Sequence, residues 1–445
     1  MKRSLIKYTA TLAVSLSLPF LSTSSLANNI SFESMSQDIS YLASDQLKGR
    51  ASFSEDIDVA AQYISQRFDE IGLVPLAGNK NFKQTFSITS IMPKELAVSL
   101  NGQAISAKNL GMASTLEQID WQNTQEFTTH VIGKDDNMRQ VLAQINQSGG
   151  KHVALINPAH SKLFNGYRRY FAQGLNKLSL DHQGAIVMVL TEQTSINTIK
   201  VNASTAITKQ TLTNVVGVLP GKEKKQEIVL YSAHYDHLGT APTGEDNTDV
   251  IYNGADDDAS GTTAIINLAQ YFANKADNAR TLMFSAFTAE EIGGFGSRYF
   301  SKQLNPDDVV AMINIEMIGK PSKFGAGNVW MTGMDRSNLG QLLNENLKMK
   351  NTQIYADPYP KQNLFYRSDN ATLARLGVPA HSFSSTQLDK DQHYHQTSDD
   401  LASLDLQSMH QVIESLSIAT HGLVDGSITP TRVDVNKIKG HGKIY

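Results

Sequence analysis

From residue 213 onward, short apolar runs alternate with helical patterns, and this alternation constrains the fold more than any other feature. Five runs of this kind predict buried strands, at 214–219, 228–233, 282–287, 309–315 and 378–383. Between the second and third runs, apolar residues at 261–273 recur at helical spacing. The pattern is typical of an α/β fold in which helices flank a central, mostly parallel sheet.

Ionisable side chains come directly after three of these runs. His234 and Asp236 follow the second run, Glu290 and Glu291 follow the third, and Glu316 follows the fourth. In open α/β sheets, ligands bind outside the carboxyl ends of the strands. We therefore expect these groups to lie close together at one edge of the sheet.

Two loops add further polar groups. Residues 253–261 contain three consecutive aspartates, and residues 393–400 contain two histidines. Alone, the aspartate run is also typical of a solvated loop or a helix start. Together with the histidines and glutamates, it favours a pair of metal ions bridged by a carboxylate, because close like charges repel unless a cation lies between them. The chain has no cysteine, so the ligands must be histidines and carboxylates, which suit zinc.

The ordered motifs resemble the bacterial leucyl aminopeptidase family of co-catalytic zinc exopeptidases (clan MH). That family includes relatives of aminopeptidase Y, plasma glutamate carboxypeptidase and glutaminyl cyclase. The motifs are AHYDHLG (233–239), NGADDDASG (253–261), FTAEEIGGFGS (287–297), NIEMIG (314–319), RSD (367–369) and HYHQTSDD (393–400). The resemblance implies a zinc-exopeptidase fold and covers about residues 213–425 and the region of the N-terminal helix.

The resemblance implies two zinc ions per chain, with Asp257 bridging them. His234 and Glu316 would complete one site, and Glu291 and His395 the other. The family usually has Asp at the position of Glu316, so this ligand is one methylene longer but keeps its carboxylate.

Catalytic roles also follow from the resemblance. Glu290 is expected to be the general base, and Asp236 to orient His234 through its far ring nitrogen. The peptide bond after Asp257 is often cis in this family. Asp258 is expected to shape its loop, like Asp256, and, as a substrate-binding candidate, to lie near the substrate amine.

Other residues near the motifs leave alternatives open. Met317, Phe365 and Tyr366 either line a side-chain pocket or belong to the core, and Arg367, Ser368 and Asp369 either line the pocket or brace it. Asp256 is expected to shape its loop and His237 to lie in a second shell or at the rim. His393 is the rival of His395, and His381 is expected to be a core histidine.

The domain organisation is predicted as a signal peptide at 1–27, the start of the catalytic domain at 28–87, an insertion at 88–212, the catalytic domain at 213–428 and a tail at 429–445. Residues 55–71 are expected to form a helix capped by Ser54 and ended by Gly72. The insertion is expected to be β-rich, weakly resembling a protease-associated domain. The positive start, apolar stretch and small residues before Ala27 predict a cleaved signal peptide, hence a periplasmic or secreted protein without membrane insertion.

The function predicted from these features is that of a zinc aminopeptidase acting on peptides. A formal net charge of −4 and a pI near 6.3 argue against nucleic acid as the partner. The alternatives are a carboxypeptidase, dipeptidase or glutaminyl cyclase of the same fold and, more remotely, a non-catalytic binding protein. The oligomeric state is not predicted.

Overall fold

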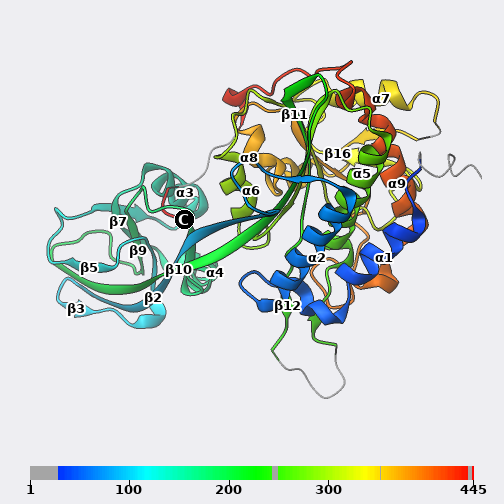
Figure 1. Cartoon of the computed structure of the whole chain (residues 1–445). Helices are drawn as coiled ribbons and strands as arrows, with labels where there is room; N and C mark the ends of the chain where they lie inside the picture. The colour runs from blue at the N-terminus through cyan, green and yellow to red at the C-terminus, as the bar shows by residue number, and fades with distance from the viewer. Residues whose placement is uncertain (1–28, 243–248, 351, 439–442) are drawn as a thin grey trace, which may run out of the picture.

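The computed structural model describes residues 29–242, 249–350, 352–438 and 443–445. These residues form two lobes joined by long strands, and the larger lobe is built around one mixed sheet (Figure 1). The predicted signal peptide at 1–27 lies outside the described residues. None of the helices in the described ranges has both the length and the apolar character that crossing a membrane requires.

The large lobe begins with helices α1 (Phe32–Leu42) and α2 (Glu55–Ile71). The bounds of α2 are those predicted from the sequence. The hydroxyl of Ser54 accepts the N–H of Ile57 at 3.2 Å, and Gly72 ends the helix in a left-handed conformation with φ of 84°.

The large sheet has the strand order β17-β16-β18-β15-β11-β14-β10-β2-β3. Its strands are β2 (Lys83–Leu100), β3 (Gln103–Ala104), β10 (Ile199–Leu219), β11 (Lys224–His234), β14 (Arg280–Phe287), β15 (Val309–Ile315), β16 (Val329–Met331), β17 (Ile354–Ala356) and β18 (Ala380–Ser384), with β1 (Val74–Pro75), β5 (Gln118–Trp121) and β8 (Leu175–Lys177) pairing at its side. All five predicted runs lie in or overlap these strands. The central strands β18, β15, β11 and β14 are parallel as expected, whereas β10 and β16 pair antiparallel at their flanks, so the sheet as a whole is mixed.

Helices cover both faces of the central strands. One face packs against α1, α2, α5 (Gly261–Lys275), α7 (Leu339–Leu347), α9 (Leu406–Ala419) and α10 (His421–Val424); the other packs against α6 (Phe295–Ser301) and α8 (Asn370–Ala374) (Figure 1). In β11, Val229 and Tyr231 join the first core and Leu230 joins the second. Because both faces are buried, the strands are continuously apolar rather than alternating.

The small lobe grows out of the large sheet rather than hanging from a linker. Strands β2 and β10 pair from Lys83 with Val215 to Leu100 with Ile199. At their far end lies a second sheet of β4 (Leu110–Ser114), β9 (Ala185–Leu190), β7 (Lys151–Ile156) and β6 (Thr128–Ile132), with helices α3 (Met138–Ser148) and α4 (Ser161–Ala172) (Figure 1). The predicted boundaries at 88 and 212 therefore fall inside paired strands, and helices accompany the expected strands.

The predicted tail returns to this small lobe. The side-chain oxygen of Asn146 in α3 accepts the main-chain N–H groups of Ile444 (2.7 Å) and Tyr445 (2.9 Å). Ile444 is buried in the same core cluster as Phe171, against which the ring of Tyr445 packs. The end of the tail thus belongs structurally to the insertion.

Candidate metal centre

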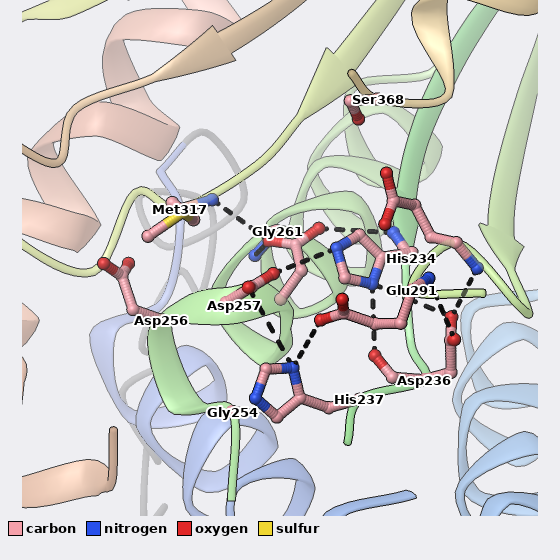
Figure 2. A network of polar contacts seen from close by, with 12 residues as sticks. His234, Asp236, His237, Gly254, Asp256, Asp257, Gly261, Glu291, Met317 and Ser368 are labelled. Atoms are coloured by element: carbon pink, nitrogen blue, oxygen red, sulfur yellow. Dashed lines mark hydrogen bonds and ion pairs between the residues drawn. The ribbon is translucent and has the colours of Figure 1, made fainter. Parts of the chain in front are cut away.

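The carboxyl ends of the parallel strands bring the predicted groups together. His234 is the last residue of β11, and it is level with Phe287 at the end of β14. Glu290 and Glu291 follow β14, Glu316 follows β15, and Asp257 lies in the turn at Ala255–Ser260 that precedes α5. Figure 2 shows several of these side chains pointing toward one another.

Asp257 lies at the centre of the cluster. Its Oδ1 is 3.1 Å from Nε2 of His234, and its Oδ2 is 3.2 Å from Nε2 of His395. Its two oxygens therefore face two different histidines, as a bridging carboxylate requires. His234, Asp257 and Glu316 form one possible ligand group, and Asp257 with Glu291 and His237 forms a second.

The donor atoms of the cluster fit a metal better than a hydrogen-bond network. Nε2 of His234, Nε2 of His395 and Oε1 of Glu291 are all buried without a hydrogen-bond partner, although Nε2 of His395 lies 3.3 Å from Glu291 Oε2. Buried polar atoms are rarely left unpaired in native proteins. Atoms that converge at such distances without hydrogen-bond geometry are arranged as ligands around a shared cation.

The opposite charges of Asp257 and the two histidines stabilise each other. Burial raises the pKa of Asp257, but contacts with His234 and His395 outweigh it and bring the pKa far below its usual range. The contacts with Asp257 and Glu291 raise the pKa of His395 to about 10. Zinc binds neutral imidazole, so metal binding at this site must displace protons.

The pKa values of Glu290 and Glu316 are shifted in the opposite direction from that of Asp257. Burial raises the pKa of Glu316 to about 7. Burial, with the charges of Glu316, Asp369 and Glu291 nearby, also raises the pKa of Glu290, although His234 opposes this. The region thus holds more carboxyl groups than its own cations neutralise.

Asp236 does more than the sequence predicted. The main-chain oxygen of Asp236 lies 3.1 Å from Nδ1 of His234, closer than its carboxylate oxygen at 3.8 Å. The carboxylate accepts the N–H of Glu290 at 3.0 Å and the hydroxyl of Ser52 at 3.1 Å. Orientation of His234 therefore comes mainly from the main chain, and the Asp236 carboxylate holds the turn that carries the two glutamates.

Asp258 shapes its loop, as expected, rather than lying near the substrate amine. It is fully buried, and its carboxylate accepts the N–H groups of His234 (3.2 Å), Gly261 (3.0 Å) and Met317 (3.2 Å). It therefore fastens three segments around the site. The Asp257–Asp258 peptide bond is cis, as the resemblance implied.

A cavity of about 360 Å³ opens onto the cluster. Its lining residues are Asp257, Glu290, Glu291, Glu316, Met317, Trp330, Thr332, Gln362, Leu364, Arg367, Ser368, Ser382, Ser384, Leu388, Asp391, Gln392, Tyr394 and Gln396. Met317 has the position expected of a pocket residue. Tyr366 does not line this cavity, because its ring packs against Phe365 and Arg336.

The remaining three histidines near the motifs differ in their surroundings. His393 lies outside the cluster, with Nδ1 3.0 Å from the hydroxyl of Ser398. His381 is a core histidine as expected, held by Ser337 and the main-chain oxygen of Thr332. Of the two positions expected for His237, a second shell or the rim, burial excludes the rim. Its Nδ1 lies 2.8 Å from Oε1 of Glu291.

Residues 214–419 match the model of peptidase family M28. Over this region the chain is similar to that family. The resemblance predicted from the motifs is confirmed at the level of the family, and the α/β fold with it.

Individual relatives agree with the M28 match. The chain is 25% identical over 186 residues to a probable zinc metalloprotease of Pyrenophora teres f. teres, covering 41% of this chain and 37% of that protein. It is 30% identical over 118 residues to aminopeptidase YwaD of Bacillus subtilis, covering 26% and 23%. The matched segments thus span well under two thirds of these relatives. An aminopeptidase from Aneurinibacillus sp. strain AM-1 shares the fold at 18% identity, with a TM-score of 0.55 over 93% of this chain and 97% of that one.

Arg50 supports the metal cluster, although no motif in the sequence marks it. Its guanidinium is fully buried and donates to the main-chain oxygens of Tyr235 (2.8 Å), Asn253 (2.6 Å) and Gly254 (3.0 Å). Burial lowers the pKa of Arg50 to about 10, so it remains charged at neutral pH. No local spacing signals this role, because its partners lie about 200 residues along the chain.

Replacing Arg50 should destabilise the fold around the metal centre. Arg50→Met removes the hydrogen bonds to the main-chain oxygens of Leu42, Tyr235, Asn253 and Gly254. It also removes a buried cation from the neighbourhood of several aspartates. We expect the free energy of unfolding of the metal-free protein to fall by about 3–5 kcal/mol, measured by urea denaturation. Arg139→Met, at an exposed arginine, is the matched control; equal stability of the two variants would contradict this role for Arg50.

Proposed function

We propose that this protein is a zinc-dependent aminopeptidase that removes N-terminal residues from peptides by means of two zinc ions. The observation that carries the proposal is the position of Asp257, whose two carboxylate oxygens face His234 and His395. Family membership supports zinc and peptide hydrolysis. Beyond zinc and peptide hydrolysis, we propose that two ions bind and that cleavage takes place at the N-terminus of the peptide.

The ionisable residues of the site divide into metal ligands and one carboxylate, that of Glu290, which is not a ligand. His234, Asp257 and Glu316 would hold one ion, and Asp257, Glu291 and His395 the other. Bound zinc would polarise the scissile carbonyl and lower the pKa of a water molecule. Glu290 lines the cavity beside these ligands but belongs to neither ligand group.

Glu290 is therefore the proposed general base. Its carboxylate would take a proton from the attacking water and later return it to the leaving amine. The Asp236 carboxylate accepts the main-chain N–H of Glu290 and so fixes the turn from which Glu290 reaches the cavity.

Glu290 supports a preference for a free N-terminus. Its carboxyl group lines the reactive end of the cavity and belongs to neither ligand group. Its negative charge would attract the ammonium group of a peptide and repel a carboxylate. The carboxyl groups of Asp257, Glu291 and Glu316 line the same end, but bound zinc would neutralise them.

We further propose that the enzyme works in the periplasm or outside the cell. The support is the charged and apolar pattern of residues 1–27.

A peptide library tests the activity. The zinc-loaded protein is incubated with peptides that have either free or acetylated N-termini, and the products are identified by mass spectrometry. We expect single residues to be lost from free N-termini only. Trimming from the C-terminus, or cleavage of dipeptides alone, would replace this proposal with a sister activity.

Replacing Glu290 separates catalysis from metal binding. Glu290→Gln should keep two zinc ions, because Glu290 is not a ligand, while kcat falls roughly 10²–10⁴-fold because the base is lost. Glu291→Gln is the matched comparison and should lose zinc. Metal content is measured by mass spectrometry and turnover with a chromogenic peptide. Near-normal kcat in Glu290→Gln would refute the assignment of the base.

Arg367 is expected to influence substrate length. It is the one Lys or Arg among the described residues that line the cavity, and no ion pair to it occurs among them. It is placed to bind the carboxylate of a short peptide. Arg367→Gln should raise KM at least several-fold for tripeptides with a free C-terminus, leave kcat similar, and have little effect on C-terminally amidated tripeptides. An equal rise in KM for both substrates would contradict carboxylate recognition.

A further inference from the structure

His237 lies inside the metal cluster, although neither the expected ligand set nor the proposed mechanism uses it. It is only 2% exposed, and both of its ring nitrogens are buried without a hydrogen-bond partner. An imidazole with two unpaired nitrogens is unfavourable in a protein interior. The ring therefore requires a partner that the protein atoms around it do not supply.

The position of the His237 ring is fixed from two sides. Its main-chain N–H donates to the main-chain oxygen of Arg50 at 3.2 Å. Gly254 packs against the ring so closely that an added Cβ would lie 2.5 Å from Cγ of His237. The ring is thus held toward the cluster by the same loop that Arg50 fastens.

The ring is aimed at the second ligand group. Nδ1 of His237 lies 2.8 Å from Oε1 of Glu291 and 4.0 Å from Oδ2 of Asp257 (Figure 2). The short contact lacks hydrogen-bond geometry, because both Nδ1 of His237 and Oε1 of Glu291 remain without such a partner. A nitrogen and two carboxylate oxygens that converge in this way form the donor arrangement of a zinc ligand group.

We propose that His237 is a ligand of the second metal ion, through Nδ1, together with Asp257, Glu291 and His395. This inference rests on the proposed two-metal site. The two sites then differ in kind: the second has four protein donors, whereas the first, with His234, Asp257 and Glu316, has three. Zinc sites with four protein ligands are closed, and those with three keep a position open for water or substrate.

This difference in the number of protein donors implies different functions for the two ions. The four donors of Asp257, Glu291, His395 and His237 would hold the second ion more tightly than three donors hold the first. The three donors of His234, Asp257 and Glu316 would leave room for water or substrate beside Glu290, which lines the cavity.

Cobalt(II) in place of zinc tests this assignment without any substrate. The protein loaded with two cobalt ions is studied by ¹H NMR, in which the exchangeable N–H protons of ligating imidazoles are shifted far downfield. We expect three such signals, from His234, His237 and His395, and two in His237→Gln. His393→Gln, at the nearby histidine outside the cluster, should keep three.

Zinc titration by calorimetry gives a second measurement. His237→Gln should weaken the tighter of two binding events at least tenfold and leave the weaker one unchanged. Two signals in the unmodified protein, or unchanged signals in His237→Gln, would overturn the assignment of His237 alone. Failure of the unmodified protein to bind two ions would overturn the proposed two-metal site itself, and the absence of peptidase activity would leave both binding results valid.

Discussion

The concentration of buried negative charge at one edge of the sheet is the constraint on which the rest of the large lobe depends. Asp236, Asp256, Asp257 and Asp258 are all at most 3% exposed, and three glutamates stand beside them. Burying carboxylates is unfavourable unless each is paired or hydrogen-bonded. The fold meets this requirement with main-chain N–H groups, two cationic side chains and a ligand geometry suited to metal.

The cations come from distant parts of the chain. Arg50 fastens the segments at Tyr235 and Asn253 from the N-terminal side. Lys320 pairs with Asp256 at 3.4 Å and with Asp399 at 3.6 Å, and Asp399 in turn accepts the N–H of Asp257 at 3.1 Å. Asp256 also accepts the N–H of Gly319 at 2.7 Å. Protein atoms alone thus make many contacts that hold the loop around Asp257, and such support favours tight and selective coordination.

The small lobe is joined to the large lobe by strands that the two lobes share, and the end of the chain packs against the small lobe. Strands β2 and β10 belong to both lobes, and Asn146 fastens residues 444 and 445 to α3. Movement of the small lobe relative to the large lobe would bend paired strands rather than a free linker. The boundaries predicted from changes in composition fall inside these strands, because nothing in the residue pattern marks where a strand passes from one lobe to the other.

The sequence by itself determined the strands and the order of the motifs, and through the family resemblance of those motifs it predicted most candidate ligands. Buried parallel strands are continuously apolar, and the polar residues that follow them must lie at one edge, so His234, Glu291 and Glu316 could be located without coordinates. Only the tertiary structure decided which neighbours turn inward. Asp258 and Asp257 are adjacent and chemically identical, yet one is bonded to main-chain N–H groups and the other faces two histidines. The role of Arg50 and the inward position of the His237 ring became visible only in three dimensions. Both depend on contacts with segments far away in the chain, and such contacts leave no periodic pattern in the sequence.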